Sequence, residues 1–303
     1  MAQLALKIDV DTWRGTREGV PLLVEALKRH GANATFLWSL GPDHTGRAIR
    51  RVFRPGFLSK VSRTSVIEHY GIRTLLYGTL LPGPDIGRRE AALMRRVRDA
   101  GFEMGIHTWD HIRWQDFVAG QDAAWTRAEM KKAADRYAEV FGTPARTHGA
   151  AGWQMNEAAY AFEAELGLDY ASDGRGFGPF QPVDAAGREF GVPQLPTTLP
   201  TLDELIGLDG WTADNVHQHL LGLTAEAGTN RHVYTLHAEL EGMRLLPTFE
   251  RLLAGWSDQG YRLVSCRELF DSLDRATLPR HQVLMGEIAG RSGRLALQGS
   301  PVV

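Results

Sequence analysis

Two histidines and two aspartates in this sequence have the types and spacing of a metal-dependent catalytic site. His107 and His111 lie four residues apart at the end of a short apolar run, and Asp9 and Asp11 end another apolar run near the N-terminus. Two imidazoles and one carboxylate form an open metal site with room for water. On an extended chain both aspartates point to the same side, roughly 6.6 Å apart along the strand. One aspartate can therefore bind the ion while the other reaches a water that the ion holds.

This ligand set serves both hydrolases and oxygenases. Hydrolysis of an amide needs a polarised carbonyl, an activated water and a protonated leaving amine, and a divalent ion supplies the first two. Non-haem iron oxygenases also use two histidines and a carboxylate. Their usual all-β jelly roll fits poorly with the helix-rich pattern of this chain, so we favour hydrolysis.

The composition predicts one globular domain. Of the 303 residues, 43% are hydrophobic and 23% are charged, as in ordinary folded proteins, and α/β barrels commonly reach this length as a single domain. A formal net charge of -2 argues against nucleic acid as a partner. The single cysteine excludes an intramolecular disulfide, and no apolar run is long enough for a signal peptide or a membrane span. We therefore expect a cytoplasmic protein.

Hydrophobic periodicity predicts strands and helices in alternation. We expect strands over residues 4–11, 34–38, 102–107, 145–148, 168–172, 193–195, 232–237 and 261–265. We expect helices over residues 17–30, 85–100, 123–141, 156–166, 214–226, 247–259 and 266–275. This order predicts a parallel sheet that is closed, or nearly closed, into a barrel. For the Gly-rich tail, residues 279–303, no helix or strand is predicted.

Two long segments interrupt the alternation, at about residues 43–84 and at residues 173–189. Both follow strands, and in a parallel barrel the loops after the strands carry the functional residues, so we expect both to face the substrate. Residues 47–63 combine basic and apolar side chains, a pattern that an anionic membrane surface attracts. The alternative is a solvated helix packed by its apolar face. The residues expected to contact the membrane are Arg50, Arg51, Arg54, Phe53 and Phe57.

Four motifs in order resemble the polysaccharide deacetylase (NodB-homology) family. They are residues 9–11 (DVD), 34–37 (ATFL), 105–111 (GIHTWDH) and 235–237 (TLH). That family has a distorted (β/α) barrel of mostly parallel strands, and its metal-dependent members remove acyl groups from amino sugars. Segments 9–21, 150–153, 172–176, 199–204, 237–242 and 286–291 resemble one branch of it. That branch deformylates 4-deoxy-4-formamido-L-arabinose-phosphoundecaprenol for lipid A modification.

The resemblance implies a role for each residue of the site. Asp11, His107 and His111 would bind one divalent ion, usually zinc, with Asp9 as general base and His237 as general acid. It also implies a polyprenyl-phosphate-linked amino sugar as substrate and a peripheral position on the cytoplasmic face of the inner membrane. A deacetylase of another N-acylated sugar or glycan is the alternative within the family. A catalytically inactive lipid- or sugar-binding protein is disfavoured because both Asp9 and His237 are present. No protein partner is inferred.

The sequence departs from the family where an arginine beside a proline usually orients the catalytic aspartate. Here residues 146–154 read RTHGAAGWQ, and either Arg146 or Arg175 is available for that role. Arg175, Trp153, Glu239 and Glu241 are expected to contact the substrate. Trp153 offers a ring for a sugar to stack on, and the two glutamates follow His237 at a spacing that suits hydrogen bonds to a sugar.

Overall fold

The computed structural model describes residues 2–48, 71–225, 231–291 and 293–302. The strands are β1 (Gln3–Val10), β2 (Thr35–Ser39), β3 (Glu103–Thr108), β4 (Thr147–His148), β5 (Tyr170–Ala171), β6 (Gln181–Val183), β7 (Arg231–His237), β8 (Arg262–Val264), β9 (Arg280–Gly286) and β10 (Leu295–Pro301). The α-helices are α1 (Val20–Arg29), α4 (Ile72–Leu76), α5 (Ile86–Arg89), α6 (Ala91–Asp99), α7 (His111–Phe117), α8 (Ala123–Phe141), α9 (Glu157–Glu165), α10 (Leu202–Leu205), α11 (Val216–Thr224), α12 (Leu246–Asp258) and α13 (Cys266–Asp271). Helical turns of other types occur at η1 (Gly15–Gly19), η3 (Val118–Gly120), η4 (Ala151–Trp153) and η5 (Arg275–Thr277).

The main sheet is parallel and is centred on β1. In the described part of the chain its order is β5-β4-β3-β2-β1-β7, and β8 pairs with the N-terminal half of β1. Because all these neighbours are parallel, the carboxyl ends of β1, β2, β3 and β7 meet at one end of the sheet. Residues that follow these strands are therefore brought together, although they are far apart in sequence.

The gap between the outer strands β5 and β7 is bridged by residues 193–198. The amide of Leu195 donates to the carbonyl of Ala171 on β5 at 2.8 Å, and the amide of Thr198 donates to the carbonyl of Val233 on β7 at 3.0 Å. The strand expected over residues 193–195 is thus reduced to isolated pairings. The sheet curls into a distorted barrel, which confirms the predicted fold class.

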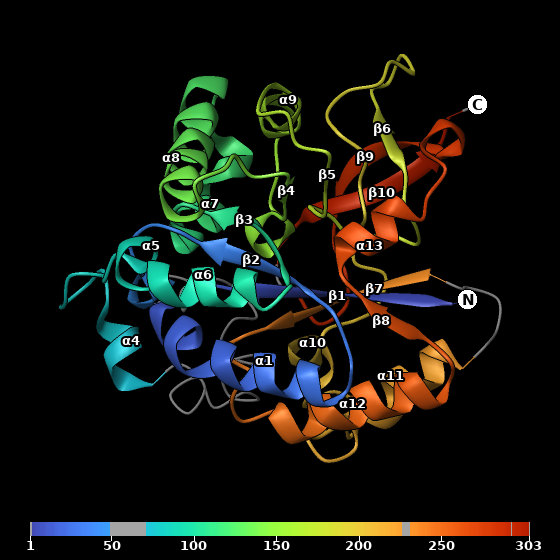
Figure 1. The fold of residues 1–303 in the computed structure, drawn as a ribbon. Coiled ribbons are helices and arrows are strands. Elements are labelled where there is room, and N and C mark those ends of the chain that lie inside the picture. Colours follow the sequence, from blue (N-terminus) through green and yellow to red (C-terminus); the bar gives the residue numbers. More distant parts are fainter. Residues whose placement is uncertain (1, 49–70, 226–230, 292, 303) are drawn as a thin grey trace.

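Helices surround the barrel because the strands present apolar side chains outward. Leu4, Leu6, Ile8 and Val10 of β1 are fully buried in the larger core beneath the helices, and each such side chain contributes roughly 1.5–3 kcal/mol by burial. Figure 1 shows α1, α11 and α12 below the sheet in this view, with α8 and α9 above it. The alternate residues of β1, which include Lys7 and Asp9, point into the barrel.

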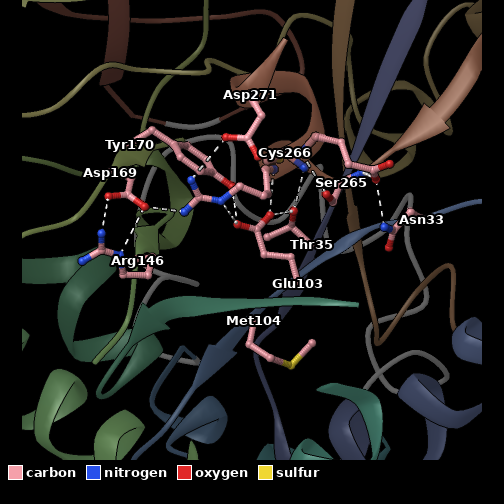
Figure 2. A network of polar contacts seen from close by, with 12 residues as sticks. Asn33, Thr35, Glu103, Met104, Arg146, Asp169, Tyr170, Ser265, Cys266 and Asp271 are labelled. Carbon is pink, nitrogen blue, oxygen red and sulfur yellow. Dashed lines mark hydrogen bonds and ion pairs between the residues drawn. The ribbon is translucent and has the colours of Figure 1, made fainter. Parts of the chain in front are cut away.

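The N-terminal end of the barrel is plugged by α13 and a polar network (Figure 2). Glu103 accepts hydrogen bonds from the hydroxyl groups of Thr35 at 2.5 Å and Tyr170 at 2.6 Å. Its carboxylate also accepts from the backbone N–H of Arg267, in the first turn of α13, at 2.8 Å. Acceptors at helix N-termini are favourable, so Glu103 fastens α13 to the strands. Helix α13 and this network therefore occupy the N-terminal end of the barrel.

The C-terminal tail forms a second, smaller sheet that reaches the open end of the barrel. β9 and β10 are antiparallel neighbours, and β6 pairs with β9. The amide of Arg175 donates to the carbonyl of Ala296 at 2.9 Å, and the amide of Gln298 donates to the carbonyl of Arg175 at 2.8 Å. These bonds attach β10 to the glycine-rich segment that follows β5.

Two further elements differ from the sequence prediction. The helix expected over residues 85–100 is divided into α5 and α6 at Glu90, which has φ -110° and ψ 12°. The carboxylate of Glu90 accepts a hydrogen bond from the indole of Trp13 at 2.6 Å. Helix α7 was not anticipated, because His111 and the residues after it lack a long apolar period.

The predicted membrane-contact residues lie outside the described residues, as part of the insertion at about 43–84. These are Arg50, Arg51, Phe53, Arg54 and Phe57. The start of the insertion is held to the barrel by Asp43, whose carboxylate accepts from the backbone N–H groups of Trp13 at 2.9 Å and Thr45 at 3.0 Å. Among the described helices, none combines the length and apolar character that crossing a bilayer requires.

Candidate active site

The three predicted metal ligands converge at the open end of the barrel. Nε2 of His107 lies 3.1 Å from Oδ1 of Asp11, and Nε2 of His111 lies 3.3 Å from Oδ2. Oδ1 of Asp11 is buried and has no hydrogen-bond partner among the described residues. Burial alone would raise the pKa of Asp11, but the imidazoles of His111 and His107 outweigh it and hold that pKa well below its usual range. Three donor atoms so close together, one of them an unpaired carboxylate oxygen, fit a divalent cation.

The local structure fixes the orientation of both histidines. Nδ1 of His107 lies 2.6 Å from the carbonyl oxygen of Gly149, so Nδ1 is assigned as the donor and Nε2 is left to face Asp11. His111 is the first residue of α7, and Asp110 caps that helix by accepting from the backbone N–H of Arg113 at 3.1 Å. The β3–α7 junction thus directs both ligands to one point.

Asp9 lies on the same inward face as Asp11 and is 4% exposed. Its Oδ2 is 3.7 Å from Nζ of Lys7, and its Oδ1 is 3.9 Å from Nδ1 of His107. Lys7 is fully buried and donates to the carbonyl of Ser172 at 2.9 Å across the barrel. Sequence reasoning missed Lys7, although a lysine in a buried strand two residues before Asp9 must share its face.

Neither Arg146 nor Arg175, the two arginines expected as candidates to orient Asp9, forms an ion pair with Asp9. Arg146 pairs with Asp169 at 2.8 Å near the N-terminal ends of the strands, where Figure 2 shows both residues. Arg175 pairs with Glu204 at 2.6 Å. The short contact of Asp9 with a cation is instead made by Lys7.

His237 ends β7, where it is the register partner of Asp9. Burial opposes protonation of this imidazole, but the carboxylates of Asp203, Asp11 and Glu241 outweigh it and raise the pKa of His237. The raised pKa favours the protonated form that a general acid requires.

Glu239 and Glu241 are almost completely buried and bind the backbone around the site. Oε1 of Glu239 accepts from the backbone N–H groups of Asp11 at 3.1 Å and Thr12 at 2.7 Å, and so shapes the turn that carries Asp11. Oε2 of Glu241 accepts from the backbone N–H of His237 at 2.8 Å. Burial and the neighbouring Asp11 raise the pKa of Glu239 to about 8, and burial raises the pKa of Glu241 to about 7.

One wall of the site is built around the indole of Trp153, which is 2% exposed. The guanidinium groups of Arg291 and Arg175 lie 4.1 Å and 4.9 Å from its ring centroid, within cation–π range. Both guanidinium groups also bind Oε1 of Glu204, at 2.7 Å and 2.6 Å. Arg291 lies in the C-terminal tail, for which the sequence predicts no helix or strand. The motif-like segments 199–204 and 286–291 were the only sequence signal for this pairing.

A second buried group supports the loop that holds His107. Nδ1 of His148 lies 2.8 Å from both Oε1 of Glu163 and Oδ1 of Asp173, and Asp173 also accepts from the backbone N–H of Ala150 at 2.9 Å. Although burial opposes its charge, the carboxylates of Asp173 and Glu163 raise the pKa of His148 to about 10. This group fastens β4, α9 and the segment after β5 beside Gly149.

The fold and the site together define a class of protein: a barrel hydrolase in which two histidines and one aspartate are placed as a metal ion would require. The polysaccharide deacetylase family model matches residues 4–171. The chain belongs to the polysaccharide deacetylase family, and it is accordingly a hydrolase of C–N amide bonds. The jelly roll usual for an iron oxygenase is not this fold.

Two curated relatives resemble the chain over most of its length. The "Probable 4-deoxy-4-formamido-L-arabinose-phosphoundecaprenol deformylase ArnD" of Shewanella sediminis (strain HAW-EB3) is 38% identical over 303 residues, which is 100% of this chain and 96% of that relative. The protein of the same name from Wigglesworthia glossinidia brevipalpis is 29% identical, over 94% of this chain and 98% of the relative.

Solved structures agree on the fold. A "putative polysaccharide deacetylase" from Mycobacterium smegmatis has a TM-score of 0.63 at 15% identity and covers 95% of this chain and 96% of its own. A "probable Polysaccharide deacetylase" from Pseudomonas aeruginosa PAO1 has a TM-score of 0.57 at 14% identity and covers 87% of each chain. At such identities the likeness concerns the fold alone.

Proposed function

We propose that this protein removes the formyl group from 4-deoxy-4-formamido-L-arabinose-phosphoundecaprenol and leaves the free 4-amino sugar on its lipid. The observation that carries the proposal is the convergence of Asp11, His107 and His111 beside Asp9 and His237. The specific substrate is supported by full-length similarity to a relative that is named for this activity. The whole chain acts as one domain, and the insertion at about 43–84 faces the lipid.

Asp11, His107 and His111 would hold one divalent ion, which we propose to be zinc. When bound, such an ion polarises the amide carbonyl and lowers the pKa of water toward about 7. Imidazole and carboxylate are donors that zinc accepts readily. The hydrogen bond from His107 to Gly149 keeps Nε2 available for the ion.

Asp9 and His237 divide the proton transfers between them. Asp9 accepts a proton from the attacking water, with the ammonium of Lys7 3.7 Å away. His237, whose pKa is raised, donates a proton to the departing amine of the sugar. The two roles need opposite protonation states, and the neighbouring charges supply them: a cation beside the base and carboxylates around the acid.

The wall of the site that faces the substrate is formed by Arg175, Trp153, Glu239 and Glu241. Arg175 has an Nε without a hydrogen-bond partner among the described residues, and Glu239 likewise has a free Oε2. The Nε of Arg175 is suited to donate to a phosphate or sugar oxygen, and the Oε2 of Glu239 is suited to a hydrogen bond with a sugar hydroxyl. Trp153 supplies an apolar surface beside the guanidinium of Arg175, which lies 4.9 Å from its ring centroid, and Glu241 acts through the backbone of His237.

We propose that the protein works on the cytoplasmic face of the inner membrane as a peripheral protein, since the polyprenyl tail of the substrate stays in the bilayer. The described part of the insertion supports this location. Ile72 and Leu80 are 67% and 80% exposed, and Arg73 beside them is also exposed. Apolar side chains flanked by cations are suited to an anionic lipid surface.

The test is mass spectrometry of purified formamido-arabinose lipid incubated with the protein, with and without a chelator. We expect a product lighter by one formyl group, release of formate, and loss of turnover with the chelator. Release of acetate from N-acetylated sugars, without formate from this lipid, would favour the alternative deacetylase.

A further inference from the structure

The C-terminal tail carries a side chain into the barrel mouth. Arg291 lies in the turn between β9 and β10, and its side chain is 12% exposed. Its guanidinium covers the Trp153 ring at 4.1 Å, and its Nε donates to Oε1 of Glu204 at 2.7 Å. Its Nη2 lies 3.5 Å from Oδ2 of Asp203. One residue of the tail thus contacts both the indole of Trp153 and the carboxylates of Asp203 and Glu204.

The backbone beside Arg291 is shaped for this contact. Gly290 has φ +80°, a conformation that favours glycine, and an added Cβ would lie 2.6 Å from the carbonyl oxygen of Glu204. The tail therefore touches α10 directly through its backbone as well as through its charge. A turn that only connected β9 to β10 would not need this close approach.

The residues that Arg291 binds belong to a short helix that depends on outside support. Helix α10 spans Leu202–Leu205, a single turn with a capping box between Thr201 and Glu204. Arg175 and Arg291 both donate to the same oxygen of Glu204. Isolated helices of this length are unstable, so these two guanidinium groups hold α10 in place.

The clamp matters to the reaction because Trp153 lies beside Lys7: Nζ of Lys7 is 5.7 Å from the centroid of the Trp153 ring and 3.7 Å from Oδ2 of Asp9. Of the neighbouring carboxylates, Asp203 makes the largest contribution to raising the pKa of His237. A displacement of α10 or of the indole would therefore change the surroundings of Asp9 and His237.

We propose that Arg291 is a positioning residue of the hydrolase: by clamping Asp203, Glu204 and Trp153 it holds α10 in place and keeps the indole beside Lys7, which contacts Asp9. The inference rests on the proposed function, since it assigns Arg291 to the same reaction. It makes the C-terminal hairpin a part of the active site.

The experiment compares Arg291→Ala with the wild-type protein in formate release from purified formamido-arabinose lipid. Because a misplacement of about 1 Å in an active site can cost about 100-fold in rate, we expect kcat to fall by about that factor, with KM and bound metal unchanged. Added guanidinium chloride at low millimolar concentration should restore part of the lost rate. Arg294→Ala is the control: Arg294 lies in the same turn, and its side chain donates to the carbonyl of Met285.

Activity is expressed per folded protein, measured by the thermal unfolding transition, so that a folding defect cannot imitate the effect. Gly290→Ala, which keeps the guanidinium but pushes the turn from Glu204, should also lower kcat. The proposal is overturned if Arg291→Ala keeps kcat within about threefold of the wild type, if only KM rises, or if the loss disappears once corrected for folded protein. An inactive wild type would instead refute the proposed function.

Discussion

Asp9 and His237 are register partners on the adjacent parallel strands β1 and β7. Paired residues on neighbouring strands point to the same face and lie about 5 Å apart. The backbone N–H of Ala238 also donates to the carbonyl of Asp9 at 3.0 Å, so the pairing continues past the end of β7. The proposed base and acid are therefore held next to each other by the sheet itself, although they are 228 positions apart in the sequence.

Asp9→Asn is expected to abolish hydrolysis and retain the metal ion. The amide cannot accept the proton from water, and general-base catalysis is worth about 100- to 10,000-fold. The metal stays because Asp11, His107 and His111 are unchanged. Formate release and elemental analysis of the purified variant measure the two properties. Asp135→Asn, on the exposed face of α8, is the matched control, and an Asp9→Asn protein with wild-type activity would refute the base assignment.

Lys7→Met is expected to lower kcat by about 10- to 100-fold with the fold preserved. The substitution keeps the length of a buried side chain but removes the positive charge 3.7 Å from Asp9. It also removes the hydrogen bond to the carbonyl of Ser172. Steady-state kinetics and circular dichroism check the result, with Lys28→Met on α1 as the control. Unchanged kcat would show that the charge of Lys7 is unimportant to Asp9.

Much of the fold was predictable from sequence because the barrel follows from local periodicity. The strands that carry the site have continuous apolar runs, and the first glycine after a helix marks its end at positions such as Gly142, with φ +75°. The three candidate metal ligands were predictable for the same reason, since Asp11 follows β1, His107 lies near the end of β3 and His111 begins the helix after it. Parallel pairing then requires their convergence.

The rest of the site depends on contacts between distant segments that have no local signal. Arg291 donates to Glu204, which is 87 residues away in the sequence. It does so from a hairpin whose apolar pattern is too weak to predict a strand. A single lysine in an apolar strand does not by itself indicate a functional site, so Lys7 does not stand out in the sequence. The sequence also has no signal for the backbone amides that donate to one oxygen of Glu239 and one oxygen of Glu241. Only the folded arrangement could reveal those amides.

Removal of the metal by a chelator is expected to abolish activity and lower Tm by about 4 °C. An ion at one hundred times its Kd adds about 2.7 kcal/mol, and an unfolding entropy of about 2.1 cal/mol/K per residue makes each kcal/mol worth about 1.6 °C for a chain of 303 residues. Scanning calorimetry with and without dipicolinate measures the shift. Asp11→Asn should show little further shift, because its site already lacks one ligand. An unaltered wild-type Tm together with full activity would contradict metal dependence.

The buried group of His148, Glu163 and Asp173 predicts that stability falls as pH rises from about 6.5 to 10. In the folded protein the two carboxylates raise the pKa of His148 to about 10, whereas the unfolded imidazole titrates near 6.5. The folded state therefore binds more protons in this window, and its advantage is lost as pH approaches the folded pKa. Glu163, whose pKa is also raised, acts in the same direction.

His148→Gln should flatten this pH dependence and cost about 3–5 kcal/mol at pH 7, because Asp173 then lacks its charged partner in a buried position. Urea unfolding at pH 7 and at pH 9.5 measures both effects, and the difference between wild type and variant cancels groups elsewhere that titrate in the same window. His30→Gln, at the end of α1, is the control. If wild type and His148→Gln lost stability equally between the two pH values, His148 would not carry the charge, and the loop beside Gly149 would have to be held by neutral hydrogen bonds.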